Sequence, residues 1–437
     1  MNTNYKNFMY IFCVTSVMLV LSASCSIQKK IHHQANNILL NTNQLNNAQV
    51  GISIYQPSTK KYLYNHQAKK YFIPASNTKI FTCYAAMKNL GDSLVGAHYI
   101  NDDNTFIVQF SADPTFLHPN FIRQPVLDFL KNNSVVILKN NNNIKPWGRG
   151  WAWDDFNDDY MAERSVAPIF GNVVHFEKKG NQLFTFPTYF KDSLTIFSST
   201  QHNQFNIERN FFTNQFSVLK SNKKFTSIDI PFITSELLTI ALLEDSLHKH
   251  IEYIDAAIEN KQWKKIFSQS TDSLLKIIMH RSDNFFAEQC LLMIGNEKFG
   301  NMNDALTIDT LLKTDFKLLP QPLKWVDGSG LSRYNLCTPQ DLVWVLNCMK
   351  DEFGWARTST IFSEGNSGSL SGYYTQHAKN ICAKTGTLSN IVALSGYITT
   401  KKKKECIFSI LINQHQSTAT EIRRLIEKFL IDFIEKN

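Results

Sequence analysis

The alternation of hydrophobic and polar residues predicts strands at both ends of the chain. Residues 49–55 alternate and lead into a Pro-Ser-Thr-Lys turn, after which residues 61–64 form the second strand of a hairpin. Near the C-terminus, three apolar stretches have the length and composition of buried strands: residues 381–384, 392–399 and 406–413. Together these segments predict an antiparallel sheet.

Hydrophobic residues recur at helical spacing in the stretches between and beyond these strands. Ile80, Tyr84 and Met87 belong to a helix that starts close to residue 79 and that Gly91 can end. Thr338 and Pro339 are the residue types preferred at an N-cap and at the first position of a helix. The same periodicity predicts helices near residues 233–247, from 268 to a break at 281–284, from there to 293, and at 338–349 and 421–435.

The middle of the chain has a different pattern, with short alternating stretches at residues 105–110, 134–138, 182–186 and 194–197. Apolar residues persist throughout, which indicates a folded insertion rather than a linker. We therefore predict an α+β protein with an antiparallel sheet flanked by helices. Its discontinuous main domain would comprise residues 37–95 and 260–437, interrupted by a large, mainly β domain at residues 96–259.

Composition bounds the function only broadly. The chain of 437 residues is 43% hydrophobic and 19% charged, which is typical of a globular protein with two or three domains. Its net charge of +8 is scattered, and the densest basic run, the four lysines at residues 401–404, falls between two predicted strands. We interpret that run as a solvated hairpin tip, and no basic stripe with interleaved aromatic residues indicates nucleic-acid binding.

The first 24 residues have the features of an export signal. Lys6 supplies a positive start, an apolar stretch follows from Met9 to Leu21, and small residues precede Cys25. This arrangement is similar to a bacterial lipoprotein signal, although the leucine stands four residues before the cysteine rather than three. We predict an exported, periplasmic protein that is tethered to a membrane by a lipid on Cys25, with residues 25–36 as the tether. Ordinary signal cleavage without a lipid is the alternative.

The remaining cysteines give no framework for disulfides or metal. Six of them lie beyond the signal, show no paired spacing, and several stand in apolar stretches, as small buried side chains do. One disulfide is possible, but its pairing cannot be derived from the sequence. No Cys/His zinc pattern and no His-Glu-x-x-His motif is present, so we expect neither metal nor cofactor.

Ser76 and Lys79 stand at the junction of the apolar run 71–73 and the helix that follows. A serine and a lysine three residues apart at a helix start lie on one face, about one turn from each other. Serine needs an adjacent base to act as a nucleophile, and a lysine can be that base if its pKa is lowered. Other Ser-x-x-Lys pairs occur here by chance in a lysine-rich chain, including Ser58 and Lys61.

Two further motifs follow in the chain, Ser282-Asp283-Asn284 and Lys384-Thr385-Gly386. The three motifs in this order are typical of penicillin-binding proteins and class A β-lactamases. In such a set, Ser282 can relay a proton to the leaving amine, and Asn284 can hold both the substrate amide and Lys79. Lys384 and Thr385 can bind a substrate carboxylate. Gly386 would let the substrate backbone approach the strand, and the backbone N–H groups of Ser76 and Thr387 would form the oxyanion hole.

The chain resembles the class C low-molecular-weight penicillin-binding proteins, a group of D-Ala-D-Ala carboxypeptidases and endopeptidases. The resemblance is carried by Pro74-Ala75-Ser76, by residues 281–289, 327–333 and 384–388, and by residues 113–115 and 150–155 of the insertion. It implies a penicillin-binding, β-lactamase-like transpeptidase fold. It also implies peptidoglycan stem peptides as substrates and sensitivity to β-lactams. Asp155 would be a candidate for meeting a positively charged amine of a cross-linked peptide; an ordinary aspartate in a turn is the alternative.

Some features depart from the family pattern. An arginine expected shortly after residues 365–370 is absent, and residues 102–104 and 111–112 replace glycines expected around the Asp-Pro-Thr turn. The gap between the first two motifs is longer than in a class A β-lactamase, and no deacylating glutamate loop is found. A β-lactamase-like hydrolase and a non-catalytic wall-binding or penicillin-sensing protein remain alternatives to an exported serine DD-peptidase.

Overall fold

The computed structural model describes residues 28–103, 105–140, 142, 144–180, 182–198, 206–220, 226–258 and 261–437. The chain divides into two compact units. In the described part, the first unit comprises residues 28–77, Leu319–Leu323 and Leu336–Asn437. The second comprises Thr78–Leu318 and Lys324–Asn335. Cys25 and the predicted export signal lie outside the described residues.

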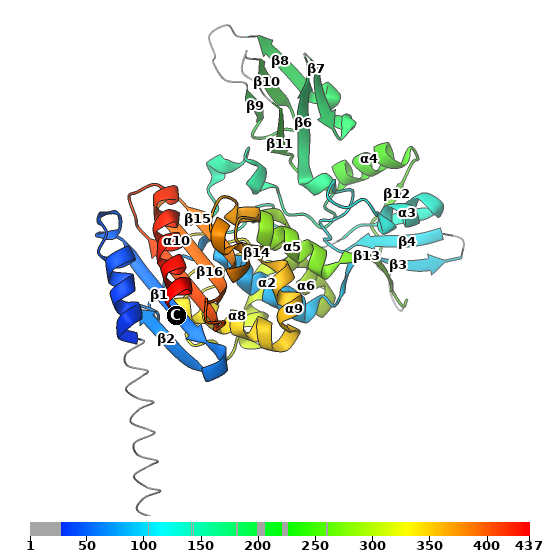
Figure 1. Ribbon diagram of the computed structural model, residues 1–437. Coiled ribbons are helices and arrows are strands. Elements are labelled where there is room, and N and C mark those ends of the chain that lie inside the picture. Colours follow the sequence, from blue (N-terminus) through cyan, green and yellow to red (C-terminus); the bar gives the residue numbers. More distant parts are fainter. Residues whose placement is uncertain are drawn as a thin grey trace, which may run out of the picture. The chain divides into compact units, whose positions relative to one another are not determined.

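The first unit is built on an antiparallel sheet. Among the described residues it has six strands in the order β14-β15-β16-β17-β1-β2 (Figure 1). Their bounds are β1 Gln49–Gln56, β2 Lys61–His66, β14 Ser363–Glu364, β15 Ile381–Leu388, β16 Ile391–Thr399 and β17 Glu405–Asn413. The strand pairing thus joins the N-terminal hairpin to the C-terminal strands through β1 and β17, which pair from Gln49 opposite Asn413 to Tyr55 opposite Ile407.

Helices cover both faces of this sheet. Phe408, Ile410 and Ile412 of β17 share one hydrophobic core with the C-terminal helix α10 (Ala419–Lys436). Successive strand residues point to opposite faces, so the residues between them face the other side, where α8 (Pro339–Phe353) packs against β17 and β1. The short helix α9 (Trp355–Ile361) follows α8. Burial on both faces explains why these strands are continuous apolar runs in the sequence.

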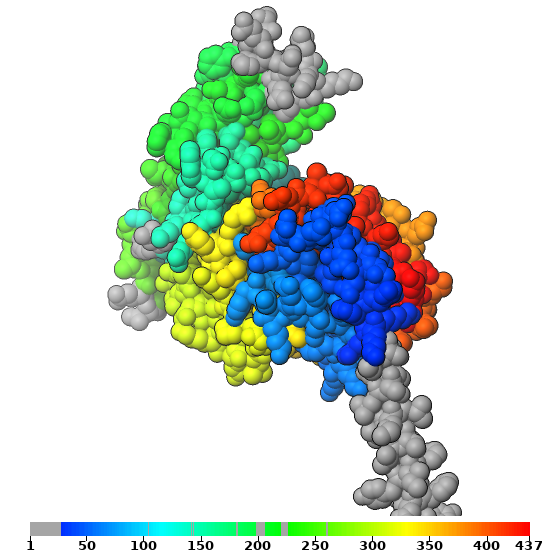
Figure 2. All heavy atoms as spheres, turned by 90° about the vertical axis from the view of Figure 1, so that its left-hand side faces the viewer, coloured from blue at the N-terminus to red at the C-terminus, as the bar shows by residue number. Residues whose placement is uncertain are grey.

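The structure differs from the predicted tether. Residues 28–35 are helical and continue into a π-helical turn, η1 (Asn36–Leu40). Ile31, Ala35 and Leu39 are buried in the same core as α10, and the Lys30 ammonium donates to the carbonyl of Lys436 at 2.6 Å. Figure 2 shows these N-terminal residues in blue beside the red C-terminal helix. Ile31, Ala35 and Leu39 have helical spacing. The helix was not predicted because most of the residues between them are polar.

The second unit contains the helices that carry the first two motifs. These are α2 (Thr78–Asn89), α5 (Thr271–Arg281), α6 (Asn284–Phe299) and α7 (Asp304–Lys313). α2 packs against both α5 and α6, and α6 packs against α7. The helix α6 is buried on all sides over its first three turns, from Phe285 to Gly295, and is therefore the centre of this bundle.

The strands of the second unit form three sheets in the described part of the chain. A five-stranded sheet has the order β12-β5-β4-β3-β13, and two three-stranded sheets have the orders β8-β10-β9 and β11-β6-β7. The helices α3 (Pro125–Asn132) and α4 (Glu236–Leu247) accompany them. Strand bounds are β3 Ser93–Asp102, β4 Thr105–Phe110, β5 Val135–Leu138, β6 Val173–Lys179, β7 Gln182–Phe186, β8 Leu194–Ser198, β9 Asn206–Arg209, β10 Phe216–Lys220, β11 Ser227–Pro231, β12 Glu252–Ile254 and β13 Lys264–Ser270.

The predicted fold class is confirmed, whereas the compact units are divided differently from the predicted domains. The helices α2, α5 and α6 belong to the same unit as the mainly β stretch 96–259. The reason is that β3 pairs with β13, the strand that leads directly into α5. Residues 264–270 show no alternation of apolar and polar side chains, so this strand was not predicted.

None of the six described cysteines forms a disulfide, and five of them are buried, as expected for small apolar side chains. A membrane-spanning helix would need a long apolar stretch, and no helix within the described residues meets that condition.

Candidate active site

Ser76 lies in a 3₁₀ turn, η4 (Ala75–Asn77), that leads into α2. The preceding residue, Ala75, is fully buried and has φ of 47°. A left-handed conformation is uncommon for alanine and is typical of positions whose surroundings enforce it. The turn is closed by the Asn77 N–H, which donates to Pro74 O at 3.1 Å. Ser76 is therefore presented by a strained, well-fixed turn and is itself half-buried.

The Lys384-Thr385-Gly386 strand lies against this turn within the first unit. β14 pairs with β15 at Cys382 and Ala383, and at the next residue the Asn77 side chain donates to Lys384 O at 3.0 Å. Lys384 is fully buried, and its ammonium donates to Thr385 O at 2.7 Å. The nucleophile candidate and the cation candidate are thus connected through Asn77, the residue next to Ser76.

Gly386 has a structural role that was not predicted from the sequence. A Cβ at this position would lie 2.9 Å from Pro74 O and 3.1 Å from the Asn77 side chain. The space on the side where a Cβ would project is therefore filled by the turn that carries Ser76. Glycine is required here because the strand and the turn approach each other closely.

The two threonines of this strand differ in exposure. Thr385 is half-buried and lines a small cavity next to Arg423. Thr387 is exposed, and its hydroxyl accepts a hydrogen bond from the Arg423 guanidinium at 2.5 Å. This arginine, from α10, adds a cation beside the strand that the sequence motifs did not reveal.

Lys79 is fully buried in the second unit. Its ammonium donates to the Asn284 side-chain oxygen at 2.6 Å and to Ser329 O at 2.7 Å. Burial lowers the pKa of Lys79 to about 8, against the opposing effect of the carboxylates of Asp327, Asp283 and Glu288. A lysine of this pKa can exchange a proton near neutral pH, as a general base must.

The Ser282-Asp283-Asn284 motif forms the connection between α5 and α6. Ser282 ends α5 with φ of 64°, and the Asp283 carboxylate caps α6 by accepting from the Phe286 N–H at 2.9 Å. This cap starts α6 at Asn284, whose amide accepts from Lys79 and donates to Tyr160 O at 3.2 Å. Asp283 therefore fixes the position of Asn284 by capping the helix that Asn284 begins. This role of Asp283 does not involve a substrate.

A tight loop at residues 327–332 supplies the second acceptor for Lys79. Asp327 is fully buried, and its carboxylate accepts from the N–H groups of Gly330 and Ser332 at 2.9 and 2.7 Å. It also accepts from Asn335 and from the Trp151 indole at 2.7 and 2.9 Å. These bonds hold the loop that presents Ser329 O to Lys79.

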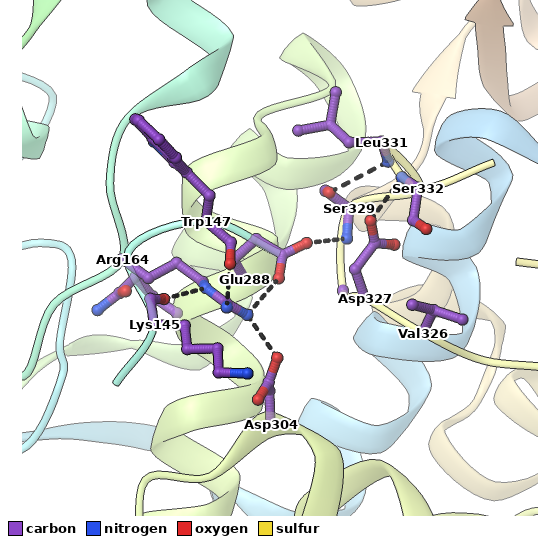
Figure 3. A network of polar contacts seen from close by, with 12 residues as sticks. Lys145, Trp147, Arg164, Glu288, Asp304, Val326, Asp327, Ser329, Leu331 and Ser332 are labelled. Carbon is purple, nitrogen blue, oxygen red and sulfur yellow. Dashed lines mark hydrogen bonds and ion pairs between the residues drawn. The ribbon is translucent and has the colours of Figure 1, made fainter. Parts of the chain in front are cut away.

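Glu288 and Arg164 form a buried ion pair beside this loop (Figure 3). The Glu288 carboxylate accepts from the Ser329 N–H at 2.7 Å, and the Arg164 guanidinium lies 3.4 Å from it and 2.6 Å from Asp304. Burial, with the neighbouring Asp327 carboxylate, raises the pKa of Glu288 to about 7. No sequence motif predicts this pair, although a glutamate inside a helix that is apolar on every face is a recognisable signal.

A cleft of about 700 Å³ borders Ser282, Asp283 and Asn284. Most of its further lining comes from the insertion and includes Asp159, Tyr160, Val173, Phe186 and Asp229. The predicted Asp155 is half-buried and does not line the cleft; it stands in η5 (Trp153–Asp155) and acts electrostatically on the hydroxyl of Tyr160. Within the described residues, no three His, Cys, Asp or Glu side chains converge as a metal site requires.

The structure thus groups the predicted residues in two sets. Ser76, Lys384, Thr385 and Thr387 belong to the first unit; Lys79, Ser282, Asn284 and Asp155 belong to the second. The chain joins the sets at the Asn77–Thr78 peptide, since Ser76 and Lys79 are three residues apart.

The chain is similar to known proteins in its sequence and in its fold. It is 22% identical to the D-alanyl-D-alanine carboxypeptidase DacB of Haemophilus influenzae, over 84% of this chain and 86% of that protein. It is 23% identical to a penicillin-sensitive carboxypeptidase A of Dictyostelium discoideum, over 86% and 85% of the two chains. The crystal structure of penicillin binding protein 4 (dacB) from Haemophilus influenzae superposes with a TM-score of 0.72 at 19% identity and covers 91% of this chain and 98% of that one.

That likeness of structure shows the fold. The family assignment comes from residues 31–432, which match the D-Ala-D-Ala carboxypeptidase 3 (S13) family. The match includes all three motifs, Ser76 to Lys79, Ser282 to Asn284 and Lys384 to Gly386. The chain belongs to the D-Ala-D-Ala carboxypeptidase 3 (S13) family.

Proposed function

We propose that the protein is an exported serine DD-peptidase that hydrolyses D-Ala-D-Ala or cross-link peptide bonds of peptidoglycan through an acyl-enzyme on Ser76. In this mechanism the Lys79 amine takes the proton of the Ser76 hydroxyl, and the alkoxide attacks the carbonyl carbon of the scissile bond. Ser282 passes the proton on to the leaving amine. Water then attacks the ester and releases the peptide from Ser76.

Other residues of the site would bind the substrate. Lys384 and Thr385 bind its terminal carboxylate, and Asn284 orients its amide while it holds Lys79. The N–H groups of Ser76 and Thr387 stabilise the oxyanion, a contribution of about 3–4 kcal/mol for each donor in serine hydrolases. β-Lactams would acylate Ser76 in the same way; a structure of the Haemophilus influenzae relative has been solved in complex with a β-lactam.

The observation that carries the proposal is the environment of Lys79. Its amine is buried, held by Asn284 and Ser329 O, and has a pKa lowered to about 8. At neutral pH this shift from 10.5 gives about 300-fold more of the neutral amine than an unperturbed lysine would have. Only the neutral amine can accept a proton from serine.

Labelling with fluorescent penicillin tests the nucleophile. Ser76→Ala is expected to abolish the covalent label, because alanine lacks the hydroxyl oxygen that would form the ester with penicillin. Ser58→Ala is a matched control, since Ser58 also stands three residues before a lysine, is exposed, and should label like the unaltered protein. Label that survives Ser76→Ala would show that another serine is acylated. Rapid loss of label in the unaltered protein would favour a β-lactamase, and absence of label a non-catalytic protein.

Endopeptidase action is a second candidate, favoured by the cleft beside Ser282 and Asn284. A volume of about 700 Å³ is typical of sites that bind drug-sized ligands and is far more than a single terminal alanine requires. The cleft would hold the second stem peptide of a cross-link. The carboxylates of Asp159 and Asp229 in the cleft, and Asp155, which acts electrostatically on Tyr160, would favour a peptide that carries an amine.

We also propose that the mature protein begins at Cys25 with a lipid that holds it on a membrane. The apolar stretch 9–21 and the small residues before Cys25 support this. Cys25→Ser is expected to move the protein from the membrane fraction to the soluble periplasmic fraction, with its penicillin labelling unchanged. Continued sedimentation of this variant with membranes would show that another feature anchors the protein.

A further inference from the structure

Glu288 is an ionisable side chain in the middle of a buried helix, and the mechanism above does not use it. It lies one turn after Asn284 on α6 and is fully buried. An unpaired carboxylate in such a position would be strongly destabilising. Glu288 therefore has two partners, the Ser329 N–H at 2.7 Å and the Arg164 guanidinium at 3.4 Å.

Ser329 connects Glu288 to the catalytic base. Its N–H donates to Glu288, and its carbonyl accepts from the Lys79 ammonium at 2.7 Å. The second acceptor of Lys79, Asn284, is on the same helix as Glu288. The first turns of α6 thus place both known acceptors of the amine. Asn284 belongs to the helix itself, and the Ser329 carbonyl is held through the bond between Glu288 and the Ser329 N–H.

Arg164 connects the same network to the insertion. Its guanidinium donates to the carbonyls of Lys145 and Trp147 at 3.1 and 3.0 Å and pairs with Asp304 at 2.6 Å. It also lies over the ring of Trp151, whose indole N–H donates to Asp327. Figure 3 shows Arg164 and Trp147 on one side of Glu288 and the loop with Ser329 on the other.

We propose that Glu288 is a positioning residue for Lys79, and that its ion pair with Arg164 lets residues 145–164 of the insertion control the catalytic base. The inference rests on the proposed role of Lys79. Glu288 acts by holding Ser329, so that the amine stays in place in both its charged and its neutral state. Above its pKa of about 7, its negative charge also favours the charged amine.

The sign of that electrostatic effect is fixed by the groups around the amine. Lys79 faces the carboxylates of Asp327, Asp283 and Glu288 and the Cys83 thiol, all of which raise its pKa against burial. Removal of the Glu288 charge removes one of these opposing effects, so the pKa of Lys79 falls further. Acylation, which needs the neutral amine, then extends to lower pH.

The rate of acylation by penicillin, measured from pH 5 to 9, tests the proposal. In Glu288→Gln, which keeps an acceptor for Ser329, we expect the rise of rate with pH to move down by about half a unit or more. Its plateau should stay within about threefold of the unaltered protein. In Glu288→Ala, which releases Ser329, we expect the plateau to fall about 10- to 100-fold. Glu252→Gln, which neutralises an exposed glutamate on β12, is the control and should change neither.

A merely structural role predicts another result. Both Glu288 variants would then lower the thermal stability and the amount of active protein. The pH at which the acylation rate rises would stay unchanged, and the plateau rate per active site would equal that of the unaltered protein. That outcome overturns the proposal. If the unaltered protein shows no Ser76-dependent acylation at all, the proposed function fails rather than this inference.

The Arg164 pairing has its own test, which holds even if Glu288→Ala does not fold. Arg164→Met leaves Glu288 as a buried, unpaired carboxylate and should lower both the melting temperature and the plateau. Adding Glu288→Gln removes that charge, so the double variant should melt higher and acylate faster than Arg164→Met alone. If the losses of melting temperature and of acylation rate in the two single variants simply add in the double variant, the two residues act independently. That result would refute the link to the insertion.

Discussion

Unusual backbone conformations occur at both proposed catalytic serines, at the residue before Ser76 and at Ser282 itself. Ala75 has φ of 47° directly before Ser76, and Ser282 itself has φ of 64° at the end of α5. Such conformations cost of order 1–3 kcal/mol each and persist only where the surroundings determine them. Here the burial of Ala75 and the cap that Asp283 provides for α6 supply that constraint. These constraints fix the backbone at both serines before any substrate binds.

Lys384 is the residue for which the chemistry makes the sharpest prediction. A charge-assisted hydrogen bond contributes about 1.5–3 kcal/mol, so its loss should lower kcat/KM about 10- to 150-fold on a peptide that ends in D-Ala-D-Ala with a free carboxylate. Lys384→Met is the suitable change, because the side chain is fully buried and methionine preserves most of its volume. Steady-state hydrolysis measures the effect.

The control for Lys384 is the substrate rather than a second variant. The same peptide with its C-terminal carboxylate converted to an amide offers no charge to Lys384, so Lys384→Met should change its hydrolysis little. Equal losses on both peptides would contradict a carboxylate-binding role. They would indicate that Lys384 acts on Ser76 through the contact between Asn77 and the Lys384 carbonyl.

At the scale of elements, the sequence predicted best where periodicity and local chemistry agree. Thr338 caps α8 in a capping box with Asp341, and the break at 281–284 falls between α5 and α6 as expected. β16 and β17 were found within one residue of their bounds because strands buried on both faces are apolar throughout. The motif order likewise led to the confirmed fold and family.

Elements and contacts that depend on partners far along the chain were not predictable in this way. The strand β13 has no alternating pattern and exists because β3 pairs with it. The sequence did not reveal that Gly386 has Pro74 and Asn77 as close neighbours, since these residues stand about 310 residues earlier in the chain. Arg164 and Glu288 are 124 residues apart, and no sequence pattern near either residue predicts that they form a pair.

At the scale of the whole molecule, each compact unit holds one part of the proposed machinery. The first unit supplies the nucleophile and the carboxylate-binding strand, and the second supplies the base, Ser282 and Asn284. The cleft belongs to the second unit and is lined largely by the insertion. We infer that the insertion has two tasks, to support Lys79 through Arg164 and to accept substrate beyond the scissile bond.

The second task predicts a selective effect on cross-linked substrates. Val173 is half-buried and lines the cleft, so Val173→Trp should fill part of its volume. We expect kcat/KM on a cross-linked muropeptide dimer to fall at least about tenfold, while hydrolysis of a monomeric pentapeptide changes less than about threefold. Mass spectrometry of the released fragments separates the two reactions in one digest.

A tryptophan elsewhere on the insertion controls for the bulk and the apolar character of this substitution. Thr195 is exposed on β8, in a different sheet, and does not line the cleft, so Thr195→Trp should leave both activities as they are. Equal losses on dimer and monomer in Val173→Trp would mean that the change disturbs Ser282 and Asn284 rather than a peptide site. Undiminished cleavage of the dimer would show that the second stem peptide lies elsewhere, and the cleft would then have no part in the choice between carboxypeptidase and endopeptidase action.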